Sequence, residues 1–333
     1  MKIIVTGCFG FIGFNFINYI SKHYPGEFKI LGLDNLSNRC SKINASKYSV
    51  KNFKHMNIDI NNIEKLDLKN YDMIINFAAE SHVDNSISNP NSFSKTNVQG
   101  LVNLLNFAKQ NKIEKFVHIS TDEVYGSSMN KKFKEDDKFN PSSPYSASKA
   151  AAELFCNAYK NTYNQKILVV RPCNNFGFFQ QPEKFIPFSI LNLINGRDVE
   201  IYGNGKNIRN WLHVEDTSSA LISLFEKNIY EGVFNISSDY YLDNYTLAKK
   251  IIEVGEFSKE KLTFVKDRPG HDFKYATNNS KIKEIGWKPQ KSLNTSLYEI
   301  IKWYSDNKFW WKTEYTKTLK MRKNRFSIKP ING

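Results

Sequence analysis

An aspartate–glutamate pair follows a predicted buried strand, at a place where side chains could carry out acid–base chemistry. The apolar run 116–119 predicts the strand, and Thr121, Asp122 and Glu123 come just after it. In open α/β sheets, ligands gather at the carboxyl ends of the strands. Two adjacent carboxyl groups can serve as acid and base if their environments push their pKa values apart.

A tyrosine and a lysine lie four residues apart at the start of a predicted helix over 147–163. The spacing places Tyr145 and Lys149 on one helix face. A lysine ammonium near a phenol favours the phenolate, so Tyr145 could act as a base near neutral pH. The alternative is a surface pair on an amphipathic helix. The polar strand end just upstream favours the catalytic interpretation.

The elements that must position these groups begin at residue 2. A strand over 2–5 leads into a loop with Gly7, Gly10 and Gly13, and a helix is predicted over 14–23. Glycines in this arrangement let the backbone turn tightly and approach a pyrophosphate at the helix N-terminus. The sequence therefore predicts a dinucleotide site at the beginning of the chain.

A second predicted strand, 28–33, ends at Asp34, about 20 residues beyond the loop, where a carboxylate can bind a ribose 2′-hydroxyl. It would repel a 2′-phosphate, so NAD is favoured over NADP; the alternative is a helix cap or a solvated turn. A third strand is predicted to end at 57–60. There Asp59 can accept a hydrogen bond from the adenine amine while Ile60 packs on the ring.

A fourth strand, 71–79, ends in small residues that would let a cofactor lie against the backbone. His82 in the polar cluster behind it could be a metal ligand, a base or a buried partner, but no second histidine stands at ligand spacing. A helix over 91–111 and a strand over 166–171 follow. This alternation predicts a Rossmann-type, doubly wound parallel sheet.

Composition limits the other possibilities. The chain has 333 residues, 41% of them apolar and 14% aromatic, which predicts one large or two intimate globular domains. No apolar run is long enough to span a membrane, and the N-terminus enters a strand without a secretory signal. The four cysteines are Cys8, Cys40, Cys156 and Cys173, and no two of them form a Cys-x-x-Cys pair. This scattered arrangement favours a reducing compartment and argues against a zinc site. The net charge of +14 suits either nucleic acid or an anionic small molecule, of which we favour the second.

Several motifs together resemble the extended short-chain dehydrogenase/reductases: Thr6-Gly7-x-x-Gly10-x-x-Gly13, Asp34, Asp59-Ile60 and Tyr145-x-x-x-Lys149. The finer resemblance is to the nucleotide-sugar 4,6-dehydratases, most closely those acting on dTDP-glucose. It is carried by residues 78–84, 120–126, 171–177, 182–187, 208–212 and 268–272, in family order. Related epimerases usually lack the Asp–Glu pair.

The resemblance implies oxidation of the hexose at C4, loss of water across C5 and C6, and return of the hydride to C6. It assigns Tyr145 as the first base, with Lys149 lowering its pKa and holding ribose. Glu123 is the base at C5, Asp122 the acid at C6, and Thr121 a partner of the C4 oxygen.

The resemblance also implies two sets of binding residues. The NAD contacts are Gly7, Gly10, Phe11, Ile12, Gly13, Asp34, Asn35, Asp59, Ile60, Phe77, Ala78, Ala79, Ser81, Thr96, Tyr145, Lys149 and Asn175. The sugar-nucleotide contacts are Ser81, His82, Thr121, Asn174, Lys184, Phe185, Tyr202, Arg209, Asn244, Arg268 and His271. No metal is expected. Cys8 and Phe9 replace the usual small pair of the glycine loop, and we expect them to crowd the pyrophosphate.

The resemblance implies a dinucleotide domain made of residues 1–177, 207–239 and 291–309. A smaller α/β substrate domain is made of residues 178–206 and 240–290, and a basic tail covers 310–333. The tail could be a solvated arm or a dimer contact. The resemblance further implies a homodimer joined through a four-helix bundle, acting in deoxysugar biosynthesis such as that of rhamnose. From the cysteines, the charge and the lack of an apolar span we expect a cytoplasmic protein with no nucleic-acid or membrane partner. The alternatives are a UDP-sugar 4,6-dehydratase, a UDP-sugar 4-epimerase and a non-enzymatic nucleic-acid-binding protein.

Overall fold

The computed structural model describes residues 1–258 and 261–327, the last four of these by their backbone alone. Its larger layer is a seven-stranded, fully parallel sheet in the order β10-β6-β5-β4-β1-β2-β3. The strands are β1 (Lys2–Thr6), β2 (Lys29–Asp34), β3 (Phe53–Asn57), β4 (Met73–Asn76), β5 (Lys115–Ile119), β6 (Lys166–Pro172) and β10 (Gly232–Ile236). The strand order reverses beside β1, which pairs with both β2 and β4. The predicted doubly wound sheet is therefore confirmed.

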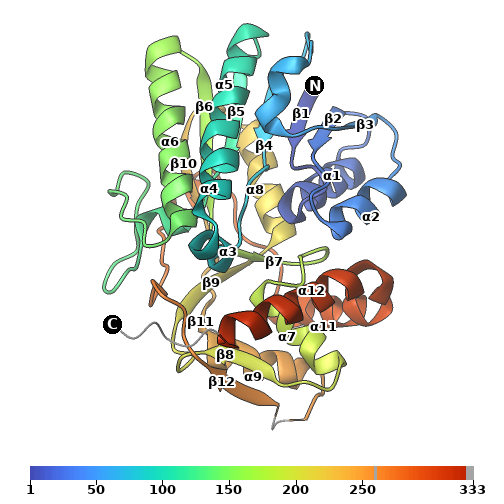
Figure 1. The fold of residues 1–333 in the computed structure, drawn as a ribbon. Helices are drawn as coiled ribbons and strands as arrows, with labels where there is room; N and C mark the ends of the chain where they lie inside the picture. Colours follow the sequence, from blue (N-terminus) through green and yellow to red (C-terminus); the bar gives the residue numbers. More distant parts are fainter. Residues whose placement is uncertain (259–260, 328–333) are drawn as a thin grey trace.

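Helices cover both faces of this sheet (Figure 1). The main ones are α1 (Phe11–His23), α2 (Arg39–Lys47), α5 (Gly100–Gln110), α6 (Pro144–Tyr163) and α8 (Val214–Glu226). Along β1, Ile3 and Val5 enter the core under α1 and α8, whereas Ile4 enters the core under α5 and α6. Side chains of a strand alternate between its faces, so a strand buried on both sides reads as a continuous apolar run.

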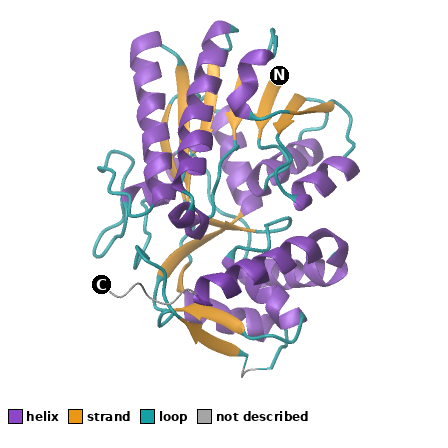
Figure 2. Ribbon diagram, in the orientation of Figure 1, coloured by secondary structure: helices purple, strands orange, loops and turns teal. Residues whose placement is uncertain are grey.

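A smaller α/β unit lies beneath the carboxyl ends of the large sheet (Figure 2). It has a three-stranded sheet, β11-β9-β7, and a two-stranded sheet, β12-β8. Its elements are β7 (Asn174–Phe176), α7 (Phe185–Ile194), β8 (Val199–Tyr202), β9 (Ile208–His213), β11 (Tyr241–Asp243), α9 (Asn244–Val254), β12 (Leu262–Val265), α11 (Leu293–Asp306) and α12 (Lys308–Ser327). Short helical segments complete the fold: η1 (Ile60–Lys65), α3 (Val83–Ser88), α4 (Pro90–Phe93), η2 (Ser94–Gln99), η3 (Asp122–Tyr125) and α10 (Ser280–Glu284).

The C-terminal helices bear on the expected domain assignment. Leu297 and Ile300 of α11 lie in the same core as α7 and α9, so α11 packs against the smaller unit. The two ends of the segment 291–309 also contact the dinucleotide domain, because Lys291 binds Glu215 of α8 at 2.7 Å and Lys47 of α2 lies over the Phe309 ring. The helical spacing of its apolar residues turns one face of α11 toward that core. The expected tail is also helical up to Ser327, and Trp311 of α12 is buried in this core. The tail is therefore not a solvated arm over the described residues.

Two other helices differ from their predicted bounds. The helix predicted over 147–163 begins at Pro144, because Ser143 forms a capping box with Ser146 and a proline is favoured at the first helical position. The helix predicted over 91–111 is divided into α4, the π-helical η2 and α5. Short π-helical turns often lie at functional sites.

None of the helices in residues 1–258 and 261–327 has the length and apolar character needed to cross a membrane.

Candidate active site

A cleft of about 550 Å³ lies between the two units, at the carboxyl ends of the parallel strands. Its volume suits a small-molecule ligand. The residues that follow β1, β2, β4, β5 and β6 line it, together with the segment 180–184 and one face of α12. The five predicted catalytic residues all lie there: Thr121, Asp122, Glu123, Tyr145 and Lys149.

The two adjacent carboxyl groups have different electrostatic surroundings. Burial, reinforced by the charge of Glu123, raises the pKa of Asp122 from its ordinary 3.8 to about 8. Burial also raises the pKa of Glu123, but the charges of Arg268, Arg209 and Lys184 oppose that rise. Asp122 is therefore suited to hold a proton near neutral pH and Glu123 to accept one.

Tyr145 departs from the expectation. Burial raises its pKa well above the ordinary value, and the charges of Glu123 and Asp122 add to the rise, while a hydrogen bond with Thr121 opposes it. Lys149 does not lower this pKa in the structure, so the expected phenolate is wrong for the protein alone. Ionisation of Tyr145 requires additional positive charge in the cleft.

Lys149 is held instead by the end of β5. Its Nζ donates to the Ile119 carbonyl oxygen at 2.7 Å and lies 3.4 Å from His118 Nε2. Burial lowers the pKa of Lys149 to about 8, although the charge of Glu153 opposes this. On its other side, His118 Nδ1 lies 3.3 Å from the amide nitrogen of Asn76 on β4. This chain of contacts fixes the lysine above the strand ends.

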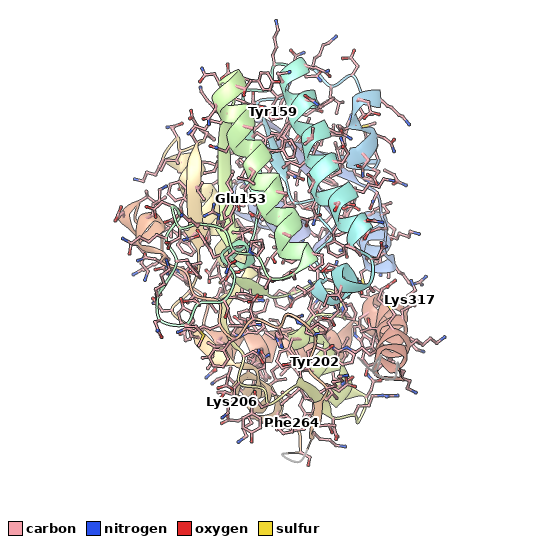
Figure 3. All side chains as sticks on the ribbon, turned by 60° about the vertical axis from the view of Figure 1, so that its left-hand side comes forward. Glu153, Tyr159, Tyr202, Lys206, Phe264 and Lys317 are labelled. Atoms are coloured by element: carbon pink, nitrogen blue, oxygen red, sulfur yellow. The ribbon has the colours of Figure 1, made fainter. Side chains whose placement is uncertain are left out.

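A buried ion pair supports the loop that carries the carboxyl pair. Arg171 on β6 binds Glu153 on α6 at 2.6 Å, and both side chains are almost fully buried. Figure 3 labels Glu153 on α6. The Arg171 guanidinium also donates to the Tyr125 hydroxyl, and Ser120 donates to Glu153. Ser120 and Tyr125, which flank the Asp–Glu pair in the chain, are therefore both hydrogen-bonded to the Arg171–Glu153 ion pair.

Sequence reasoning missed one neighbour of the predicted base. The Tyr275 hydroxyl lies 3.3 Å from Glu123 Oε2 and 2.8 Å from Asp272 Oδ2. The guanidinium of Arg209 lies 4.2 Å over the Tyr275 ring. Tyr275 stands just beyond the Arg268 motif, so its position in the chain was the available signal. Only the fold shows that it reaches Glu123.

The glycine loop is shaped for close backbone approach. Gly7 has φ +64°, and a Cβ there would lie 2.7 Å from the Ala78 nitrogen. A Cβ on Gly13 would overlap the Gly7 carbonyl oxygen. Cys8 and Phe9 are fully buried in the core and do not line the described cleft, so the expected crowding of a pyrophosphate is wrong. Both belong to the same hydrophobic core as Phe14 of α1.

The predicted adenosine side is also assembled. Asp34 accepts from the backbone nitrogens of Phe9 at 3.0 Å and Leu36 at 2.8 Å. Asp59 accepts from Asn35 Nδ2 at 3.0 Å. Burial alone would raise the pKa of Asp59, but hydrogen bonds from Asn61 and Asn35 lower it. All predicted NAD contacts line the cleft: Gly7, Gly10, Phe11, Ile12, Gly13, Asp34, Asn35, Asp59, Ile60, Phe77, Ala78, Ala79, Ser81, Thr96, Tyr145, Lys149 and Asn175. The residues therefore fit a dinucleotide.

Part of the predicted sugar-nucleotide set lines the cleft as well: Ser81, His82, Thr121, Asn174 and Lys184. Among the described residues, the buried atoms Asp122 Oδ2 and Asn174 Oδ1 have no hydrogen-bond partner within the protein. Buried polar atoms normally have partners, so these two oxygens indicate a ligand with hydroxyl or amide groups. His82 Nδ1 accepts from the Asn85 nitrogen at 3.3 Å and so caps α3.

The other predicted sugar-nucleotide contacts lie outside the cleft lining within the described chain. Arg268 and Tyr202 both bind Asp84, at 3.1 and 3.0 Å, and His271 lies 2.6 Å from Asp267. Burial lowers the pKa of His271 to about 4. Arg209 donates to the carbonyl oxygens of 272 and 273. Phe185 and Asn244 begin α7 and α9, and the structure does not bring either into the cleft.

The family model described as GDP-mannose 4,6 dehydratase matches residues 4–300. The chain belongs to this family. The resemblance stated from the motifs is therefore confirmed. The match ends before α12, which lies outside the part of the chain that the GDP-mannose 4,6-dehydratase family model describes.

Individual relatives cover nearly the whole chain. The low-salt glycan biosynthesis protein Agl12 of Haloferax volcanii is 40% identical over 91% of this chain and 98% of its own. A dTDP-glucose 4,6-dehydratase of Streptomyces niveus is 36% identical over 93% and 95%. Among solved structures, this chain is similar to DesIV, a dTDP-glucose 4,6-dehydratase from Streptomyces venezuelae crystallised with NAD and TYD bound. The two sequences are 34% identical, and the structures superpose with a TM-score of 0.89 over 94% of this chain and 100% of DesIV.

Proposed function

We propose that this protein is an NAD-dependent dTDP-glucose 4,6-dehydratase that forms dTDP-4-keto-6-deoxy-glucose. The observation that carries the proposal is the pair of adjacent buried carboxyl groups whose surroundings suit Asp122 to be an acid and Glu123 to be a base. An epimerase that only oxidises and reduces C4 does not need such a pair. The relatives and solved structures that carry this activity in their names support the choice.

The reaction divides among the residues of the cleft. Tyr145 removes the proton of the C4 hydroxyl, and Thr121 holds the C4 oxygen. Glu123 then removes the C5 proton, which the C4 ketone has made acidic, and Asp122 protonates the departing C6 hydroxyl so that it leaves as water. Glu123 finally returns a proton to C5 as the hydride reaches C6. Bound NAD supplies positive charge in the cleft and reversible hydride acceptance, so the cycle is redox-neutral overall.

The binding roles follow the placement of the residues. The glycine loop holds the cofactor diphosphate, and Asp34 selects a ribose without a 2′-phosphate. Asn174 and Lys184 contact the sugar nucleotide from the cleft wall. Arg209 and Arg268 meet its pyrophosphate after a local rearrangement, because guanidinium forks suit phosphate oxygens. The Arg268 Nε has no acceptor within the described residues and is available for this contact.

We also propose the assembly and setting of the enzyme. The outer face of α6 exposes apolar side chains, with Leu154 at 60% and Phe155 at 40% exposure, and α5 lies beside it. These features support a homodimer joined through a four-helix bundle made from two helices of each subunit. Four unpaired cysteines support a cytoplasmic enzyme of deoxysugar biosynthesis, such as that of rhamnose. In our division, the dinucleotide domain is 1–177 with 207–239, and the helices after 291 join the substrate domain.

A substrate panel tests the function. Purified protein is incubated separately with dTDP-glucose and UDP-glucose, and the alkali-induced absorbance of the 4-keto product is read. We expect strong absorbance with dTDP-glucose. A C4 epimer of UDP-glucose with no keto sugar from either substrate would make the protein a 4-epimerase instead.

A further inference from the structure

Helix α12 is anchored to both units of the molecule. Trp310 Nε1 donates to Asn44 Oδ1 of α2 at 2.7 Å, and the Tyr315 hydroxyl donates to Asn192 Oδ1 of α7 at 2.7 Å. All four of these side chains are buried. Breaking such contacts would expose large aromatic surfaces, so the helix is a fixed part of the fold.

Its far end is anchored by an arginine. Arg322 binds Glu200 of β8 at 2.7 Å, and its guanidinium lies 4.0 Å from the centre of the Phe188 ring. The helix therefore runs from α2 to β8, along the region where the two units meet (Figure 1).

One face of α12 forms part of the cleft wall. The residues on this face have helical spacing: Glu314, Lys317, Thr318, Met321 and Arg322. Lys312, on the opposite face, and Lys320, beside the edge of the cleft face, are exposed and do not line the described cleft. The family model ends at residue 300, so this wall lies beyond the segment that the family model matches.

The cleft-facing lysine of α12, Lys317, lies beside the start of α2, which contacts the glycine loop: Ser41 Oγ of α2 donates to the Phe9 carbonyl oxygen at 3.2 Å. Glu314 Oε1 accepts from the backbone nitrogen of Arg39, at the start of α2, at 3.0 Å, and Lys317 Nζ lies 3.0 Å from the same oxygen. Asn35 and Asn38 line the cleft at this end. Figure 3 shows Lys317 on α12 at the level where the two units meet.

Lys317 differs from the other cations lining the described cleft. Lys149 is held by the Ile119 carbonyl, Lys184 donates to the Ser81 carbonyl at 2.6 Å, and Arg322 binds Glu200. The Lys317 side chain is 60% exposed and its partner is a carboxylate three residues away on the same helix. Such surface pairs are worth ~0–1 kcal/mol, so Lys317 can exchange Glu314 for a stronger anion at little cost.

We propose that α12 is an additional wall of the nucleotide cleft and that Lys317 binds a phosphate group of the dinucleotide bound there. The inference rests on the proposed function for the presence of NAD. It assigns a role to a helix that the family model does not cover. In a redox-neutral cycle the cofactor remains bound between turnovers, and a cation on a fixed helix slows its release.

The test compares two charge-matched variants of the full-length protein, Lys317→Gln and Lys320→Gln. Both remove one exposed lysine from α12, but only Lys317 faces the cleft. NADH release is followed by its fluorescence on displacement with excess NAD, and NAD and dTDP affinities are measured by calorimetry. We expect Lys317→Gln to raise the NAD dissociation constant and the release rate roughly three- to tenfold, as loss of one partly exposed charge-assisted hydrogen bond would. Lys320→Gln should change neither by more than about twofold.

The outcomes separate the possible sources of the phosphate. Lys317→Glu should weaken NAD binding more than Lys317→Gln, and the difference should shrink as salt is added. Equal NAD binding by the Lys317 and Lys320 variants would overturn the proposal, as would a loss confined to dTDP, which would assign the phosphate to the sugar nucleotide. These measurements need no turnover. A missing dehydratase activity in the wild type would therefore refute the proposed function without deciding this one.

Discussion

Replacing Asp122 by asparagine should make the stability of the protein less dependent on pH. The folded protein holds the pKa of Asp122 at about 8, whereas the unfolded chain has the ordinary value of 3.8. Between these values the unfolded state loses the proton and the folded state keeps it, so the free energy of unfolding falls as pH rises. At ~1.4 kcal/mol per unit, the loss by pH 7 reaches ~4 kcal/mol as an upper estimate.

Asparagine removes this ionisation but also places an amide in a buried position. The Asp122 Oδ2 has no partner among the described residues, so the new amide group is left unsatisfied at a cost of ~1–3 kcal/mol. We therefore expect Asp122→Asn to be neutral or destabilising near pH 5 and stabilising by ~1–3 kcal/mol near pH 8. The change in sign across this range is the distinctive result.

Urea unfolding from pH 5 to 9, at a fixed cofactor concentration, measures the effect. Asp306→Asn serves as the control, because Asp306 is an exposed carboxylate on α11. The activity of Asp122→Asn should fall by roughly 10²–10⁴ at every pH, and the wild-type rate should decline as pH rises through about 8. A stability difference between Asp122→Asn and wild type that stays constant from pH 5 to 9 would refute the assignment of Asp122 as a buried neutral acid.

Three further outcomes are expected. Glu123→Gln should still reduce the bound cofactor with dTDP-glucose but form product roughly 10²–10⁴ times more slowly, whereas Tyr145→Phe should show no reduced cofactor. Turnover of Glu123→Gln at the wild-type rate would exclude Glu123 as the base. Because Asp34 disfavours a 2′-phosphate, the denatured protein should release NAD, and stoichiometric NADP in a chromatographic assay would contradict that role. Arg171→Met should lower the free energy of unfolding by ~3–5 kcal/mol in urea, because it leaves Glu153 buried without its ion pair, and a change below ~1 kcal/mol would show that the pair is dispensable.

Local patterns were sufficient to predict the parallel sheet and the place where its strands end. Strands buried on both faces, such as β5, appear as short apolar runs, and the polar residues behind them fall at one edge of the sheet. The glycine loop before α1 and the Asp–Glu pair after β5 were found in this way.

Properties that depend on long-range packing could not be predicted in the same way. The pKa of Tyr145 depends on burial and on two carboxylates contributed by a separate strand end, so its spacing from Lys149 was misleading. Phe9 looked like an obstacle because the sequence does not show on which side of the loop a side chain points. Tyr275 reaches Glu123 across 152 residues of chain.

The C-terminal helix illustrates the same limit. Its basic composition left a solvated arm and a dimer contact equally open, and the chain beyond the family motifs offered no pattern for comparison. The structure shows that two tryptophans, Trp310 and Trp311, are buried and fix the helix against the cleft. A charge count does not show which lysines of a helix face a ligand and which face solvent.

The central claim, water elimination across C5 and C6 by the Asp122–Glu123 pair, is tested most directly by turnover in deuterated water. Mass spectrometry and proton magnetic resonance of the product from dTDP-glucose should show a sugar that has lost one water and carries one solvent deuterium at C5, because the base exchanges its proton with solvent. A product that keeps the elemental composition of the substrate and carries no deuterium at C5 would contradict the account.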